Sequence, residues 1–121
     1  MDPREIALAA AKALDAKRGR DIVALNVGEM TVITDYMVIA TGTSQIQVRA
    51  LAEHVEEELE KLEVSARRRE GLSEGRWCVL DYGDVMVHIF HEQDREYYQL
   101  ERLWSDGTNE LALELDEPEQ A

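Results

Sequence analysis

The chain has 121 residues, of which 45% are hydrophobic and 32% charged, and its formal net charge is −13 at pH 7. This length and composition predict one globular domain with a core of modest size. The longest apolar run, residues 36–40, is far too short to span a bilayer, and the first residues resemble neither a signal nor a transit peptide. Because the single cysteine, Cys78, has no partner for an intramolecular disulfide, we expect a reducing cytoplasm as the location.

The negative charge bears on what the protein binds. A protein that binds free nucleic acid needs a basic face to displace counterions from phosphates. The sequence offers the short run Arg67-Arg68-Arg69 as a basic cluster. The charge favours instead an encounter with a basic partner, such as a ribosomal protein, through electrostatic steering. A simpler interpretation, that the acidity only keeps the protein soluble, stays open.

The first half of the chain predicts two helices and two strands. Residues 2–5, Asp-Pro-Arg-Glu, are typical of a capped helix start. Residues 21–27 alternate as a strand does, and residues 36–41 form a near-continuous apolar strand, which is typical of a buried central position. A second capping signal begins a long helix over residues 44–62.

The second half predicts a short strand and a β-hairpin. Residues 64–68 can form the short strand, and the strand–helix–strand order predicts its parallel pairing with residues 36–41 through a right-handed crossover. Residues 77–82 and 85–91 flank a tight turn of sequence Asp-Tyr-Gly-Asp, which predicts an antiparallel hairpin.

These elements predict an α/β domain, residues 1–106, in which a mixed sheet of about five strands packs against two main helices. Residues 93–104 add one or two short helical turns. Residues 107–121 carry acids and no basic residue, so we expect a flexible acidic tail that is dispensable for folding. The alternating leucines of this tail would also suit a frayed edge strand.

Four residues suggest an enzymatic alternative. The turn at Gly42 and Ser44 joins a strand to a helix N-terminus and could hold an anion, although its spacing fits neither a P-loop nor a dinucleotide fingerprint. Asp81 and Asp84 could bind a divalent metal, although turn geometry also favours aspartate there. Together they would suit a nucleotide-binding transferase of nucleotidyltransferase-like fold. Because no nucleophile–base pair accompanies them, we predict no catalytic residue, no cofactor and no metal site.

An apolar and aromatic cluster follows the hairpin in the sequence. Its members are Tyr97, Tyr98, Leu100, Leu103 and Trp104. The cluster could cover the edge of the sheet, or it could anchor a partner, because tryptophan and tyrosine dominate binding hot spots. The pattern alone leaves both interpretations open.

Three segments resemble signatures of the Iojap family, the bacterial ribosomal silencing factors. They are YMVIATGTSQIQVRALA (residues 36–52), Glu70-Gly71 followed by WCVLDYGDVMVHIF (residues 77–90), and REYYQLERLW (residues 95–104). The match extends over roughly residues 3–106, in the order and spacing of the family. Ile46 stands where the family often has arginine, so a contact from that position would be missing.

The resemblance implies a nucleotidyltransferase-like topology without the catalytic acids of those enzymes. It implies a translational repressor that binds the large ribosomal subunit through its protein number fourteen and sterically blocks joining with the small subunit when nutrients are scarce. With the composition, it predicts neither a membrane nor free nucleic acid as a partner. The oligomeric state is not fixed by the sequence, and a homodimer of the unbound protein is one option.

The resemblance also assigns contact positions. They correspond here to Asp35, Tyr36, Trp77, Asp81, Tyr82, Asp84, Tyr98, Leu100 and Trp104. We expect the hairpin and the segment after it to form one patch, acidic at the two aspartates of the turn and aromatic at Trp77, Tyr82 and Tyr98. A third hypothesis, beside the repressor and the transferase, is an acidic decoy that binds basic proteins loosely.

Overall fold

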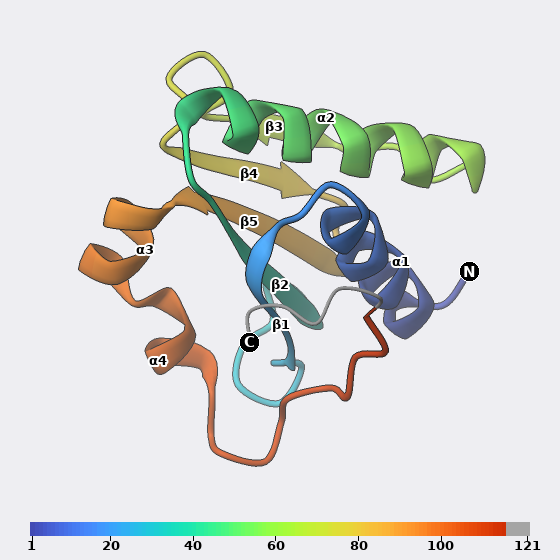
Figure 1. The fold of residues 1–121 in the computed structure, drawn as a ribbon. Helices are drawn as coiled ribbons and strands as arrows, with labels where there is room; N and C mark the ends of the chain where they lie inside the picture. The colour runs from blue at the N-terminus through green and yellow to red at the C-terminus, as the bar shows by residue number, and fades with distance from the viewer. Residues whose placement is uncertain (116–121) are drawn as a thin grey trace.

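The computed structural model describes residues 1–115, which form four helices and five strands (Figure 1). In chain order they are α1 (Pro3–Ala16), β1 (Arg20–Asn26), β2 (Tyr36–Gly42), α2 (Gln45–Lys61), β3 (Arg68–Glu70), β4 (Trp77–Asp81), β5 (Val85–His91), α3 (Glu92–Tyr98) and α4 (Leu100–Trp104). The strands form one sheet of order β1-β2-β5-β4-β3, in which the β2–β5 pair is parallel and the other pairs are antiparallel. The predicted α/β class and mixed sheet are therefore confirmed. Within residues 1–115, no helix has the length and apolar character needed to cross a bilayer.

The strand after α2, β3, does not pair with β2 as the sequence predicts. A strand at residues 64–68 is expected beside β2, but β3 begins at Arg68 and lies at the far edge of the sheet. β5 takes the place beside β2, because its largely buried apolar residues suit a central position covered on both faces. All three residues of β3 are charged and exposed, which suits an edge strand. β3 still runs in the direction of β2, although β5 and β4 separate them.

Helices α1 and α2 pack together over one face of the sheet and bury the larger core cluster (Figure 1). The buried stripe of α1 consists mainly of alanines, and that of α2 of larger aliphatic residues: Ala7, Ala10, Ala13 and Leu14, then Val48, Leu51, Val55 and Leu59. Both helices begin at the predicted caps. Asp2 Oδ1 accepts the Glu5 N–H (2.8 Å), and Ser44 Oγ accepts the Gln47 N–H (3.0 Å).

Among the described residues, the other face of the sheet is covered only in part, by α3 and α4, which lie on the side of the molecule away from α1 (Figure 1). A buried arginine fastens these short helices to the sheet. Arg95 Nη1 donates to Thr41 Oγ1 (2.7 Å) on β2, and Arg95 Nε donates to Glu101 Oε1 (3.1 Å) on α4. The predicted short helical turns are therefore present, and a charge-assisted hydrogen bond holds both in place.

The segment after α4 packs against β1. The Asn109 carbonyl accepts the Asn26 N–H (2.8 Å), and the Leu111 N–H donates to the Ala24 carbonyl (2.8 Å). Leu111 and Leu113 also pack against the larger core cluster. Residues 109–113 thus cover an edge of the sheet that would otherwise expose unpaired backbone groups.

The packed structure therefore continues past residue 106, where the sequence predicts the domain to end. The alternating leucines signalled this, since one side of an extended segment becomes apolar when every second residue is leucine. The edge-strand alternative describes the segment near Glu110, which forms an isolated antiparallel bridge with Leu25. Residues 116–121 of the predicted acidic tail lie outside the described residues.

Candidate interaction surface

The tight turn between β4 and β5 brings acidic residues to one end of the sheet. Asp81 Oδ1 accepts the Gly83 N–H (2.8 Å), and Gly83 has φ +86°, which favours glycine. The Asp84 carbonyl accepts the N–H groups of both Asp35 and Tyr36 at 3.0 Å. Asp35 and Asp84 are exposed, so two neighbouring segments present carboxylates at this end.

An aromatic cluster lies at the other end of β4. The Trp77 ring contacts the rings of Phe90 and Tyr98, with centroids 4.8 Å apart in each pair. The Trp77 Nε1–H donates to Nδ1 of His88 (3.1 Å). Trp77 is half-buried, whereas Tyr98 is 48% exposed. Asp81 follows Trp77 by four residues along the strand, a distance of about 13 Å.

The helices leave accessible a part of the sheet that extends from one of these ends to the other, and we call it the β4 face. It consists of Trp77, Val79 and Asp81 on β4 and Met86 on β5, all half-buried. These side chains point away from α1 and α2, because successive residues of a strand alternate between the two faces. The β4 face is thus aromatic at one end, apolar in the middle and acidic at the other end.

The structure divides the predicted contact residues among three places. Trp77, Tyr98, Asp81, Asp84 and Asp35 lie on the β4 face or at its ends. Tyr36 and Tyr82 pack against the core cluster beneath α1 and α2. Leu100 and Trp104 are half-buried against the smaller core cluster. The expectation of one patch that includes Tyr82 is wrong, because Tyr82 follows Asp81 in the chain and points to the opposite face.

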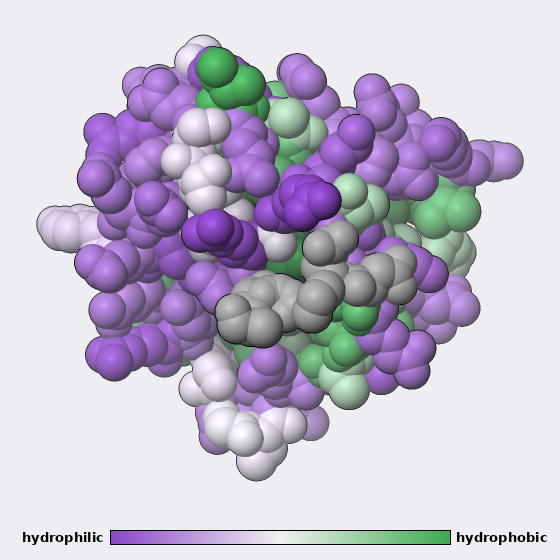
Figure 2. Space-filling view, in the orientation of Figure 1, coloured by the Kyte–Doolittle hydropathy of each residue, from purple (hydrophilic) through white to green (hydrophobic). Residues whose placement is uncertain are grey.

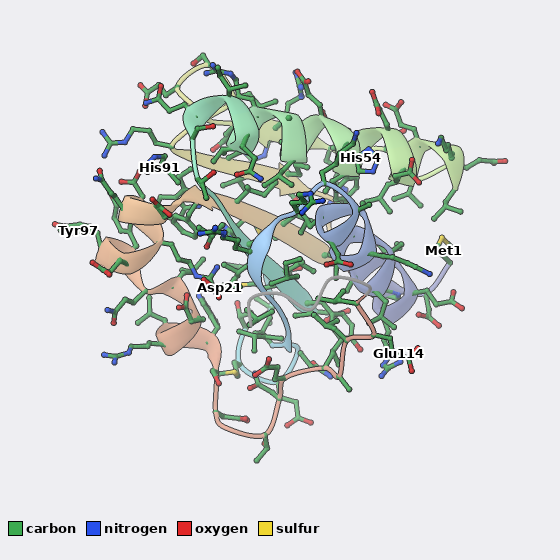
Figure 3. All side chains as sticks on the ribbon, in the orientation of Figure 1. Met1, Asp21, His54, His91, Tyr97 and Glu114 are labelled. Atoms are coloured by element: carbon green, nitrogen blue, oxygen red, sulfur yellow. The ribbon has the colours of Figure 1, made fainter. Side chains whose placement is uncertain are left out.

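Sequence reasoning missed an exposed apolar loop between β1 and β2. Val32 is 103% exposed and Ile33 is 70% exposed. The loop is closed by backbone hydrogen bonds, in which the Thr31 N–H donates to the Val27 carbonyl (3.1 Å). Tyr97 is also 79% exposed and projects from α3 away from the rest of the molecule (Figure 3). The remaining surface in this orientation is largely hydrophilic (Figure 2).

Gly71, in the second signature, has a steric role beside the aromatic cluster. Its φ is +83°, and a Cβ atom at this position would collide with the carbonyl oxygen of Trp77. Glycine therefore allows the loop before β4 to close over the start of that strand.

His88 lies buried beneath Trp77 in the β4 region. Its Nδ1 accepts the Trp77 N–H, and its Nε2 has no hydrogen-bond partner among the described residues. Because burial disfavours the charged imidazolium, the pKa of His88 is lowered to about 4. The neutral ring accepts from Trp77, so protonation of Nδ1 would remove this hydrogen bond.

We expect the stability of the protein to fall on mild acidification because of His88. A histidine whose pKa is depressed in the folded state contributes stability above the unfolded pKa, near 6.5, and loses it as the pH falls toward about 4. Between pH 6.5 and pH 5 the loss should be roughly 2 kcal/mol. Urea unfolding at both pH values should show this loss in the wild type and in His54→Gln but not in His88→Gln. Parallel losses in all three proteins would contradict this role of His88.

The residues of the transferase alternative do not meet in the structure. Gly42 and Ser44 lie at the carboxyl end of β2, whereas Asp81 and Asp84 lie near its amino end, where Tyr36 pairs with Val85. The length of this strand, about 20 Å, separates the two pairs. Ser44 Oγ is also occupied by the cap of α2. Among residues 1–115, no group of three or more His, Cys, Asp or Glu side chains is arranged to hold a metal ion.

Comparison with known proteins agrees with the signatures. Residues 1–121 match the family model described as ribosomal silencing factor during starvation, RsfS. The ribosomal silencing factor RsfS of Bacillus subtilis is 40% identical over 107 residues, which cover 88% of this chain and 91% of that protein. A mouse protein named mitochondrial assembly of ribosomal large subunit protein 1 is 30% identical over 95 residues, covering 76% of this chain and 42% of that protein.

A solved structure shows the same fold. A crystal structure of a Chromobacterium violaceum protein superposes with a TM-score of 0.85 at 36% identity and covers 98% of both chains. Because sequence and structure match over nearly the whole chain, they are stronger evidence for the family than the three short signatures alone. The chain therefore belongs to the family of ribosomal silencing factors, RsfS.

Proposed function

We propose that this protein represses translation in the cytoplasm by binding the large ribosomal subunit through its protein number fourteen and blocking the joining of the small subunit. The observation that carries the proposal is the accessible β4 face in a member of the ribosomal silencing factors. The name of the mouse relative, which refers to the large ribosomal subunit, supports this subunit as the partner.

The two ends of the β4 face suit two different tasks. Asp35, Asp81 and Asp84 attract a basic ribosomal protein, and steering by such groups acts mainly on the association rate. Trp77 and Tyr98 supply rigid aromatic area, which acts mainly on the dissociation rate. This attraction acts at short range, since salt screens charges over about 10 Å near 0.1 M ionic strength.

The other predicted contact residues take supporting roles in this proposal. Tyr36 and Tyr82 hold the ends of β2 and β4 against the helices from the opposite face. Leu100 and Trp104 pack α4 against the smaller core cluster. In this proposal these four residues hold the contact surface in shape, and they do not make its central contacts with the partner. The protein acts by occupying space, so the proposal requires no bound cofactor and no chemical step.

The test uses separated ribosomal subunits on sucrose gradients. The wild-type protein should sediment with the large subunit and keep the two subunits apart when they are mixed. In a separate kinetic measurement, Asp84→Asn should lower the rate constant of association with the large subunit roughly threefold. The salt dependence of this rate constant should become weaker, since one steering charge is lost. Glu57→Gln, which removes an exposed carboxylate on α2, is the matched control and should behave as the wild type.

Three results would contradict the proposal in whole or in part. If the protein does not sediment with the large subunit, or if it binds while joining proceeds normally, the repressor mechanism fails. If Glu57→Gln weakens binding and Asp84→Asn does not, the contact lies on α2 rather than on the β4 face.

A further inference from the structure

We propose that Arg67 and Arg68 form a second contact site beside the β4 face, which binds backbone phosphates of ribosomal RNA when the protein docks on the large subunit. The inference rests on the proposed function, because it adds an RNA contact to the proposed contact with a ribosomal protein. It gives a role to the basic run that the acidic composition leaves unexplained.

Arg67 is held at the acidic end of the β4 face. Its N–H donates to the Asp81 carbonyl (2.7 Å). Its guanidinium lies over the hairpin turn, since a Cβ atom built on Gly83 would be 3.0 Å from the guanidinium carbon. The head group of this long side chain is therefore already placed at the turn, which lowers the entropy cost of a contact there.

Arg68 points to the same face as Asp81, its partner in the β3–β4 register. Its Nε lies 3.7 Å from Asp81 Oδ2, and its side chain is 71% exposed. An ion pair this long and this exposed holds the guanidinium weakly, so the group stays available for a stronger partner. Because β3 is an edge strand, no further strand within residues 1–115 covers this arginine from the side.

Arg69 differs from Arg67 and Arg68 because it forms a strong ion pair. It points toward α2, where its Nε and Nη2 donate to the two carboxylate oxygens of Glu56 at 2.8 and 3.0 Å. This bidentate pair neutralises its charge. For Arg67, in contrast, no side-chain hydrogen bond or ion pair is formed within residues 1–115. The run thus presents Arg68 on the side of the β4 face and Arg67 over the hairpin turn at its acidic end, whereas Arg69 is neutralised.

The chemistry of the two available cations favours RNA over protein as their partner. A basic ribosomal protein would repel them, whereas the surface of a ribosome alternates between basic protein and RNA phosphates. The guanidinium group binds phosphate oxygens through two parallel hydrogen bonds. A chain of net charge −13 is repelled by RNA elsewhere on its surface, so an RNA contact requires local cations such as these.

The chain offers a matched control at the opposite end of the sheet. Lys17 and Arg20 are exposed, and Arg20 pairs with Thr41 near the carboxyl end of β2. The double variant Lys17→Gln/Arg20→Gln removes the same charge as Arg67→Gln/Arg68→Gln, but far from the β4 face. This control therefore accounts for the stronger general repulsion from the ribosome that follows when the net charge of the protein becomes more negative.

The experiment measures affinity for purified large subunits and, separately, for the isolated large-subunit protein number fourteen, at several KCl concentrations. Arg67→Gln/Arg68→Gln should bind the subunit about tenfold more weakly near 0.1 M salt. The slope of log affinity against log salt should be less steep by about 1.5, as expected for two lost phosphate contacts. Affinity for the isolated protein should be unchanged or increased, because two repelling cations are gone.

Several outcomes would overturn the inference while leaving the proposed function intact. One is wild-type affinity and salt slope for the subunit in Arg67→Gln/Arg68→Gln. Another is an equal loss in Lys17→Gln/Arg20→Gln, which would show a general charge effect. A third is an equal loss toward the isolated protein, which would place an acidic segment of that protein on the arginines. A wild-type protein that fails to bind the subunit would instead refute the proposed function.

Discussion

Replacing Trp77 by alanine should lower the free energy of unfolding by about 3 kcal/mol at pH 7, the lower end of the range for aromatic truncation in a core. The variant loses ring contacts with Phe90 and Tyr98, and it leaves Nδ1 of His88 without its donor. The lower end of the range applies because the Trp77 side chain is half-buried rather than fully buried. Urea unfolding followed by circular dichroism measures the difference.

Two further variants separate the parts of this effect. Trp77→Phe retains a ring but loses the N–H group, so its cost should be closer to 1 kcal/mol. Tyr98→Ala removes a ring that is 48% exposed and should cost less stability than Trp77→Ala. Toward the large subunit, however, folded Tyr98→Ala and Trp77→Ala should both dissociate faster, by tenfold or more for a hot-spot residue, on the order of 1.4 kcal/mol. If Trp77→Ala unfolds no more easily than Tyr98→Ala, Trp77 is not packed as described.

The role of Trp77 shows how far the sequence could predict the surface. The resemblance selects this residue as a contact, and an alternating strand places it on the same face as Asp81. The same alternation places Tyr82 on the opposite face, so the period of the strand already argued against one patch with both side chains. The contact of Trp77 with Phe90 follows from the predicted hairpin, in which the two residues pair, whereas the contact with Tyr98 depends on how α3 packs and could not be predicted.

The elements of the fold were predictable where the signal is local. The caps at Asp2 and Ser44 and the turn at Gly83 each depend on a few neighbouring residues, and each is present in the structure. The pairing of β2 was not predictable in this way. Its partner β5 begins more than forty residues after β2 ends, beyond a helix and two other strands. Selecting that partner requires knowing which strands are buried on both faces, which is a property of the assembled sheet.

A chain that ends at Asp106 should melt about 10 °C or more below the full chain, in contrast to the small change that the acidic composition predicts. Truncation removes the hydrogen bonds of Asn109 and Leu111 to β1 and takes Leu111 and Leu113 away from the core. Partial burial of two leucines and the lost hydrogen bonds together correspond to roughly 3 kcal/mol. For a domain of this size, that loss lowers the melting temperature by about 10 °C or more.

The matched control is a chain that ends at Leu115. It lacks the acids Asp116, Glu117 and Glu119 but keeps every contact described above, so it should melt within a few degrees of the full chain.

The full-length variant Leu111→Ala/Leu113→Ala should reproduce most of the loss of melting temperature caused by ending at Asp106, since it keeps all the acids and removes the packing of the two leucines. If it melts as the full chain does while the chain ending at Asp106 does not, backbone pairing to β1 rather than leucine burial holds the segment. If both melt as the full chain does, residues 107–115 contribute nothing to stability, and the domain ends where composition alone would place its boundary.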